Sequence, residues 1–227
     1  MRLDSLAAAI SDVASRFEIV VAKTDDELDD VFRLRYQVYC LERGFEPAVG
    51  GREIDRFDRL AVHALLRHRV SGQPLGTVRL VTRDPEGGSI RFPIDEVCDA
   101  PLIRQLPHDS SAEISRFALS KTFRAESGFS MPLLRLFLIR GIVLLSGMLR
   151  VTHWCALMEP CFLRLLRANS VHFQAAGELV DHHGLRQPSY GVVVDMLAQL
   201  GREQPLIWDF VTEGGTLWEE PKLLVAA

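Results

Sequence analysis

Residues 61–83 read AVHALLRHRVSGQPLGTVRLVTR, and this stretch decides the fold of the chain. Both 61–70 and 75–83 are rich in residues such as Val, Leu and Thr and read as strands. The Ser-Gly-Gln-Pro between them, at 71–74, is a turn signal. Two such runs joined by a short turn predict a β-hairpin, so we expect antiparallel strands in the central sheet.

Upstream of the hairpin, the sequence predicts a short helix at 2–16, a strand at 17–22 and then a second helix. Thr24 and Glu27 have the spacing of a capping box, in which each side chain bonds the backbone of the other at the start of a helix. Apolar residues then recur at helical spacing up to Gly44, where we expect the second helix to end.

Downstream of the hairpin, strands and helices alternate. We expect strands at 112–119, 151–158 and 171–180, helices at 131–148 and 159–168, and irregular structure at 84–110 and 181–188. This mixed order, with a hairpin after the helix at Thr24, predicts an α+β fold: a mostly antiparallel central sheet flanked by helices. No repeat or linker divides residues 1–227, so we expect one domain.

The composition excludes several classes of protein. A formal net charge of −4 gives no basic field for nucleic acid. The four cysteines form no Cys-x-x-Cys pair and have no His at zinc-ligand spacing, so we expect no metal site. Arg135 and Arg140 interrupt the most apolar segment, 131–149, which therefore falls short of the roughly 18 uncharged residues of a membrane span. We expect a cytoplasmic protein without a membrane span or a nucleic-acid partner.

Two charged clusters precede the hairpin. Arg35 and Tyr39 are four residues apart on one face of the expected helix, where an Arg can hold a carboxylate or cover apolar surface with its stem. The segment 53–58, Glu-Ile-Asp-Arg-Phe-Asp, lacks the ligand spacing of a calcium loop. It is either a solvated acidic loop, a site for a cationic group or a partner for Arg35.

The expected central strand carries Glu113-Ile-Ser-Arg-Phe-Ala-Leu119. Alternation along a strand places Glu113 and Ser115 on one face, and Arg116 on the other. Charges inside a sheet are costly unless they are paired, so Glu113 and Arg116 are candidate functional residues.

A further cluster, 181–188, reads Asp-His-His-Gly-Leu-Arg-Gln-Pro. It is interpreted as a loop that lines a substrate or carrier-protein site, as a plain surface loop, or, less readily, as a metal site, because adjacent histidines rarely bind one ion. His183 and Arg186 are its candidate binding residues.

The first half of the chain resembles the acyl-homoserine-lactone synthases. That resemblance rests on Arg35-x-x-x-Tyr39, Phe45, Asp55-x-x-Asp58, Arg79 and Glu113-x-x-Arg116, in order and spacing over roughly residues 30–120. The sequence departs from that family at Tyr39 and Phe45, where the family usually has Phe and Trp.

The second half resembles the acyltransferases associated with PEP-CTERM/exosortase systems, which are similar to N-acyl amino acid synthases. The matching segments are 151–160, 163–167 and 183–188. Both resemblances imply a GNAT-like fold and an acyl-(acyl carrier protein) thioester as donor, with no tightly bound cofactor.

CoA-using GNAT enzymes hold the CoA pyrophosphate on backbone N–H groups of a glycine-containing segment after the central strand. Here that segment is 121–129, and the glycine spacing is absent. The departure favours acyl carrier protein as the donor and partner, because its phosphopantetheine arm has no pyrophosphate. Candidate docking charges for this acidic partner are Lys121, Arg124, Arg135, Arg164 and Arg167.

The resemblance implies a long-chain acyl transfer to the amino group of an amino acid. Glu113 would be the general base and Arg116 would position it or the acceptor carboxylate, while backbone N–H groups near Phe117 and Ala118 would bind the oxyanion. Arg35, Tyr39, Asp55, Asp58 and Arg79 would order the acceptor side. The acyl tail would lie among Phe123, Phe129, Leu133, Phe137 and Trp154. The alternatives are an acyl-homoserine-lactone synthase that uses S-adenosylmethionine, a conventional acetyl-CoA enzyme, and a non-catalytic acyl-carrier or lipid-binding module.

Overall fold

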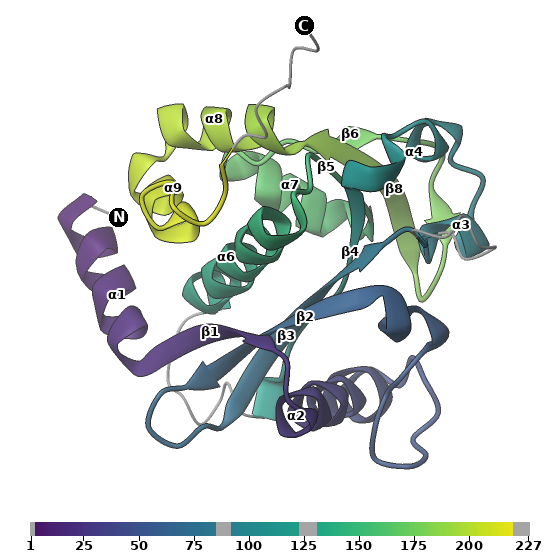
Figure 1. The fold of residues 1–227 in the computed structure, drawn as a ribbon, viewed down its shortest axis with the longest axis horizontal. Helices are drawn as coiled ribbons and strands as arrows, with labels where there is room; N and C mark the ends of the chain where they lie inside the picture. Colours follow the sequence, from purple (N-terminus) through teal and green to yellow (C-terminus); the bar gives the residue numbers. More distant parts are fainter. Residues whose placement is uncertain (1–2, 85–91, 123–130, 220–227) are drawn as a thin grey trace, which may run out of the picture. The chain divides into compact units, whose positions relative to one another are not determined.

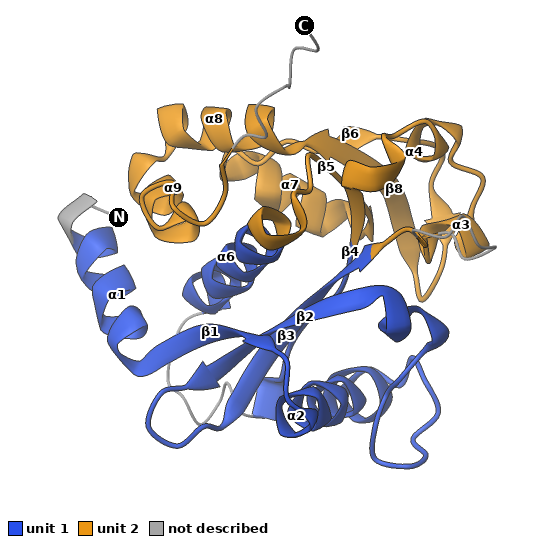
Figure 2. Cartoon of the chain, viewed as in Figure 1, with its two compact units in different colours: residues 1–81, 114–145 blue, residues 82–113, 146–227 orange. Residues whose placement is uncertain are grey.

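The structure is a computed structural model that describes residues 3–84, 92–122 and 131–219 (Figure 1). The chain divides into two compact units, residues 1–81 with 114–145 and residues 82–113 with 146–227 (Figure 2). The boundaries fall within the two strands 74–82 and 111–119 and within the long helix 131–149, so each unit is described separately. The expectation of one domain over 1–227 stays a prediction.

Unit 1 begins as the sequence predicts. Helix α1 (Leu3–Arg16) leads into strand β1 (Phe17–Ala22), and α2 (Asp25–Arg35) starts with the complete capping box of Thr24 and Glu27. The Thr24 hydroxyl accepts from the Glu27 N–H at 3.2 Å, and the Glu27 carboxylate accepts from the Thr24 N–H at 3.2 Å.

The helix after Thr24 differs from the prediction in its second half. It stops being α-helical at Arg35 and continues as a π-helix, η1 (Tyr36–Glu42). A π-helix has i→i+5 hydrogen bonds, as from the Arg43 N–H to the Val38 carbonyl. Apolar periodicity did not reveal this change: Val38 and Cys40 are buried in the π-helix, as apolar residues of a predicted helix should be.

The predicted hairpin is confirmed. Strands β2 (Ala61–His68) and β3 (Pro74–Thr82) pair antiparallel, and β1 pairs antiparallel with β2, with Val20 opposite Leu65. Within unit 1 the strand order is β1-β2-β3-β4, and β4 (Ser111–Leu119) contributes its second half to this unit.

Helices cover both faces of this part of the sheet. Leu65 packs with Val31 and Leu34 of α2, whereas the neighbouring Ala64 points to α6 (Met131–Leu149). A Cβ at Gly141 of α6 would lie 2.8 Å from the Ala64 Cβ, so the close approach of helix and sheet requires glycine there. Burial on both faces explains why 64–66 is an uninterrupted apolar run.

Helix α6 is, within the described ranges, the one helix long and apolar enough to cross a membrane by length and composition. Arg135 and Arg140 interrupt the helix as the sequence shows, but this criterion allows two charged residues, so the helix is weak evidence for a membrane span and does not overturn the expectation of none. Core helices of soluble proteins pass the same test, and Leu134, Leu138 and Val143 of this helix are fully buried in the protein.

Unit 2 contains the first half of β4 and the strands β5 (His153–Met158), β6 (Gln174–Ala175), β7 (Val180–Asp181) and β8 (Leu185–Val192). β4 pairs parallel with β5 over Ser111–Glu113, while β8 pairs antiparallel with β5, β6 and β7. The prediction of a mostly antiparallel sheet flanked by helices is confirmed.

Two predictions for this unit were wrong. The expected strand at 171–180 is reduced to the two-residue strands β6 and β7, and the expected loop at 181–188 contains the start of β8. Pro188 argued against a strand, because it cannot donate to a ladder. The structure accommodates it because only its carbonyl is used, accepting from the Ala176 N–H at 2.8 Å.

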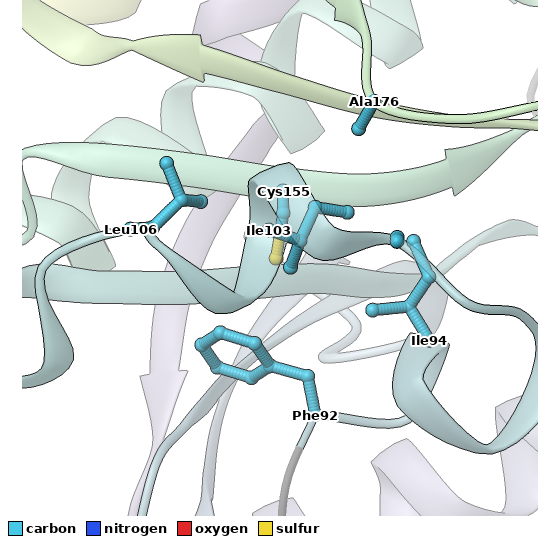
Figure 3. Close-up of a cluster of buried hydrophobic side chains, with 7 residues drawn as sticks. Phe92, Ile94, Ile103, Leu106, Cys155 and Ala176 are labelled. Carbon is cyan, nitrogen blue, oxygen red and sulfur yellow. The ribbon is translucent and has the colours of Figure 1, made fainter.

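Short helices replace the irregular structure expected in part of 84–110. They are α3 (Ile94–Val97), α4 (Pro101–Arg104) and the 3₁₀ turn η3 (His108–Ser110). Ile94 of α3 and Ile103 of α4 form a buried cluster with Phe92, with Cys155 of β5 and with Ala176 (Figure 3). The remaining helices are α7 (Pro160–Ala168), α8 (Val193–Glu203) and α9 (Pro205–Thr212).

Candidate active site

Six charged side chains of unit 1 form one hydrogen-bonded network. They come from the end of α2, the segment before β2, and strands β3 and β4. The six are Arg35, Glu53, Asp55, Asp58, Arg79 and Arg116. Three guanidinium groups face three carboxylates, so the formal charge of the network is zero.

Arg35 occupies the buried end of the network. Its Nη1 and Nη2 donate to the two carboxylate oxygens of Asp58 at 2.6 and 3.1 Å, and its Nε donates to Glu53. Such a fork-to-carboxylate arrangement is a geometry that Lys cannot reproduce. The interpretation of Arg35 as a surface residue is therefore wrong, since its side chain is 0% exposed.

Arg79 ties the hairpin to the central strand. Its Nη1 and Nη2 donate to Asp55 at 2.7 and 2.8 Å, and Nη1 also donates to Asp58 at 2.6 Å. Its Nε donates to the Ser115 hydroxyl of β4 at 2.9 Å. The Arg79 side chain is 1% exposed, so its hydrogen bonds to Asp55, Asp58 and Ser115 are buried inside the protein.

A break in the alternation of β4 brings Arg116 into the network. Ser115 and Arg116 were expected on opposite faces of the strand, yet both reach the same six-residue network. Arg116 has φ 50°, a left-handed conformation that is rare for residues other than glycine and interrupts a regular strand. Its Nη2 donates to Glu53 at 2.8 Å and to Asp55 at 3.0 Å.

The spacing Asp55-x-x-Asp58 has a local cause. The two residues form the capping box of the 3₁₀ turn η2 (Arg56–Leu60): the Phe57 N–H donates to Asp55 at 2.9 Å, and the Asp55 N–H donates to Asp58 at 2.7 Å. Each carboxylate thus bonds the backbone and the arginines together. The carboxylates of this segment therefore pair with arginines inside the protein, and the segment is not a solvated acidic loop.

Exposure divides the network into two parts. The side chains of Arg35, Arg79, Glu53 and Asp58 are closed off, whereas those of Asp55 and Arg116 are 24% and 22% exposed. Asp55 and Arg116 are one carboxylate and one guanidinium, 3.0 Å apart. A ligand can therefore meet one negative and one positive group side by side, held in place by the buried part.

The network sets the protonation of its carboxylates. Burial alone raises the pKa of Glu53, but hydrogen bonds from Arg116 and Arg35 outweigh it and bring the pKa to about 2. Asp58 behaves in the same way. Burial raises its pKa, but the hydrogen bonds from Arg35 outweigh burial and lower the pKa to about 2. Both groups stabilise the folded state fully above their ordinary pKa values, and lose that contribution as the pH falls toward 2.

His63 lies beside the network and, unlike its carboxylates, is held in the uncharged form. It is opposite Arg79 in the hairpin register, and its Nε2 is 3.6 Å from Asp58. Burial and the charge of Arg35 lower the pKa of His63 to about 4, so the imidazole is neutral at pH 7. In the unfolded chain His63 takes up a proton near pH 6.5, whereas in the folded chain it does so only near pH 4. The free energy of unfolding therefore falls as the pH drops from 6.5 to 4.

We expect His63→Gln to flatten that dependence. Wild-type stability should fall by up to about 3 kcal/mol between pH 6.5 and 4 through this one group. Urea titrations at several pH values measure the slope. His108→Gln, at an exposed His, is the control and should leave the slope as in the wild type. An unchanged slope in His63→Gln would contradict the assignment.

The aromatic candidates lie on and after the π-helix. The Arg116 guanidinium carbon is 5.2 Å from the centroid of the Tyr39 ring, a cation–π contact that adds to the carboxylate contacts of Arg116. Burial raises the pKa of Tyr39, so its hydroxyl stays protonated. Phe45 follows with its N–H bonded to the Tyr39 carbonyl at 2.8 Å.

Glu113 belongs to the half of β4 in unit 2. Its side chain is buried, and one carboxylate oxygen accepts the Ile94 N–H at 2.8 Å, at the start of α3. The ion-pair partners of Arg116 are Glu53 and Asp55, and these two carboxylates balance its charge inside the sheet. The predicted role of Glu113 as general base stays a prediction.

His183 and Arg186 lie in the β7–β8 hairpin. His183 is in the turn with φ 54°, and its carbonyl accepts from Arg186 Nη2 at 2.9 Å. Arg186 also pairs with Glu159 at 3.1 Å. Both residues therefore have a local role in shaping the hairpin, and a binding role stays a prediction.

The remaining candidates are divided between described and undescribed parts of the chain. Phe117 and Ala118 lie near the end of β4, and Ala118 is buried. Phe123 and Phe129, expected around the acyl tail, lie outside the described residues, as does most of 121–129. Trp154 is a core residue, because its indole N–H donates to the Ser146 hydroxyl at 2.8 Å and its ring stacks on Phe173.

Sequence reasoning did not select Glu53 or His63 as site residues. Glu53 joins Arg35 to Arg116, and its place two residues before Asp55 was the available signal. His63 could be found only from the hairpin register. Over the described ranges, no group of three His, Cys, Asp or Glu side chains is arranged to hold a metal ion.

Comparison with known proteins defines the fold class. The Acetyltransferase (GNAT) domain family matches residues 34–133, which include the whole charged network. The chain has the GNAT fold, with its mixed, mostly antiparallel sheet flanked by helices. No curated protein matches the chain by sequence.

Three solved structures show the same fold. The acyl-homoserine-lactone synthase LasI has 18% identity and a TM-score of 0.59 over 78% of this chain and 89% of its own. FeeM, an N-acyl amino acid synthase from uncultured soil microbes, has 17% identity and a TM-score of 0.57 over 81% and 94%. MesI, a CoA-dependent acyl-homoserine lactone synthase, has 22% identity and a TM-score of 0.59 over 87% and 94%. An association with PEP-CTERM/exosortase systems and a cytoplasmic location stay predictions.

Proposed function

We propose that the protein is an N-acyltransferase that moves a long-chain fatty acyl group from acyl-(acyl carrier protein) to the amino group of an amino acid. The observation that carries this proposal is the partly exposed pair of Asp55 and Arg116. An amino acid carries its ammonium and its carboxylate about as close together as Asp55 and Arg116 are, which is 3.0 Å. Asp55 complements the ammonium, and Arg116 complements the carboxylate.

The buried part of the network gives this pair its fixed geometry. Arg79 holds Asp55 through both carboxylate oxygens, and both Glu53 and the Tyr39 ring contact the Arg116 guanidinium. Their positions are therefore set before a ligand binds, which lowers the entropic cost of binding. In this proposal, Arg35 and Arg79 are positioning residues rather than contacts of the acceptor.

The reaction needs no covalent intermediate on the enzyme. The amine nitrogen loses a proton to Glu113, directly or through a water, and attacks the thioester carbonyl carbon. The oxyanion is held by backbone N–H groups at Phe117 and Ala118. The C–S bond then breaks, the carrier thiol takes a proton and leaves, and the N-acyl amino acid is released.

Acyl-homoserine-lactone synthesis is the second candidate. S-adenosylmethionine carries the same amino-acid group, so Asp55 and Arg116 suit it equally, and two of the similar structures, LasI and MesI, have that activity. Tyr39 and Phe45, where those synthases usually have Phe and Trp, favour the first candidate, as does the second-half resemblance.

A reconstitution with purified protein separates the two candidates. Acyl-(acyl carrier protein) is supplied with either a mixture of the twenty free amino acids or S-adenosylmethionine, and products are identified by mass. We expect N-acyl amino acids in the first reaction and no lactone in the second. Ring closure on S-adenosylmethionine expels methylthioadenosine, so its release together with a lactone would establish the alternative.

A further inference from the structure

Glu42 lies outside the charged network, and its carboxylate accepts hydrogen bonds from the backbone that follows β4. It is the last residue of the π-helix η1. Its Oε1 and Oε2 accept the Lys121 N–H at 3.0 and 2.9 Å, and Oε1 accepts the Ser120 hydroxyl at 2.8 Å. The Thr122 N–H and hydroxyl add longer contacts of 3.4 Å to Oε1.

These donors have the character of an anion site. The N–H groups of Lys121 and Thr122 and the hydroxyl of Ser120 all donate to one carboxylate just after the end of β4. Neighbouring backbone N–H groups that point to one place attract phosphate and carboxylate. Here the chain supplies the anion itself. Burial raises the pKa of Glu42, but the Lys121 and Ser120 bonds outweigh it, so the net pKa is lowered and the group is ionised at neutral pH.

The π-helix explains how Glu42 reaches these donors. Gln37, in the first turn of η1, donates to the same carboxylate at 3.3 Å; it lies five residues before Glu42, the i→i+5 spacing that defines a π-helix. Continuing α2 as an α-helix would turn residue 42 to another side of the helix. The local winding and the carboxylate position are therefore linked.

We propose that Glu42 is a specificity-determining residue that fills an anion position at the end of β4, and so excludes acyl donors that would place a phosphate there, such as acyl-CoA. This inference rests on the proposed function for the donor side of the site. A donor phosphate would have to displace an ionised carboxylate from at least two backbone N–H groups and one hydroxyl. A thioester on a protein-borne pantetheine arm needs no phosphate at that position.

The test is the binding of CoA and of pantetheine to the full chain, measured by calorimetry. Glu42→Gln keeps an oxygen for the Lys121 N–H and removes the charge. We expect it to bind CoA roughly tenfold more tightly than the wild type does, because one like charge is removed at close range. Pantetheine, which has no phosphate, should bind the two proteins equally.

Glu27→Gln is the matched control. Glu27 also accepts two backbone N–H groups, those of Lys23 and Thr24, but at the first turn of α2. It should leave both dissociation constants unchanged. Glu42→Ala provides the same comparison if Glu42→Gln folds poorly, as judged by its melting temperature.

Unchanged CoA affinity in a folded Glu42 variant would overturn the inference, as would an equal change for CoA and pantetheine. Transfer of an acyl group from acyl-(acyl carrier protein) to an amino acid by the wild type is measured alongside. Absence of that transfer refutes the proposed function alone, whereas the CoA affinity decides the role of Glu42.

Discussion

Glu113→Gln should lower kcat by roughly 10²–10⁴-fold, the range typical for the loss of a positioned general base. Glutamine has nearly the same size and can still accept the Ile94 N–H through its amide oxygen, as the Glu113 carboxylate does at 2.8 Å. It cannot take a proton from the attacking amine. Turnover should recover in part at high pH, where more of the amine is already free. Steady-state kinetics across pH measures both effects.

Glu53→Gln is the matched control for this experiment. Glu53 is also a buried carboxylate, but its partners are Arg35 and Arg116, so its loss should act chiefly on stability. We therefore expect opposite patterns: lost turnover with an unchanged melting temperature for Glu113→Gln, and a lowered melting temperature for Glu53→Gln. A large fall in melting temperature with near-normal turnover for Glu113→Gln would assign Glu113 to structure.

Arg35→Met should destabilise the protein by about 3–5 kcal/mol, the cost of removing one partner from a buried ion pair. The substitution leaves Asp58 without its two-pronged partner and Glu53 without one of its two arginines. Methionine is flexible enough to fill the space, so the loss measures unpaired charge rather than a cavity. Chemical denaturation provides the free energy of unfolding.

Arg33→Met provides the comparison on the same helix. Arg33 is 63% exposed and pairs with Asp29 one turn earlier, so this surface ion pair contributes little. We expect its replacement to change stability by less than about 1 kcal/mol. Similar losses for the two variants would show that the network does not depend on Arg35.

Local sequence signals were sufficient for most of the fold. The strand at 17–22, the capping box at Thr24 and the hairpin at 61–82 depend on neighbours in sequence, and the structure has each of them. The sequence did not predict β8, because this strand is formed by pairing with β5, β6 and β7. Such pairing between distant segments leaves no local sequence pattern.

The candidate site was predictable as a set of residues but not as a geometry. Arg35, Asp55, Asp58, Arg79 and Arg116 were all selected, and the structure joins them. The burial of Arg35 and Arg79 depends on tertiary packing, however, and the left-handed residue at 116 reverses the expected face of that side chain. Alternation along a strand predicts faces only where the strand is regular.

Mass spectrometry of lipid extracts from cells that express the protein tests the central claim most directly. Cells expressing the wild type should contain long-chain N-acyl amino acids that are absent from cells carrying the empty vector and strongly reduced in cells expressing Glu113→Gln at the same protein level. Extracts containing only acyl-homoserine lactones, or no new acylated amine, would contradict the account.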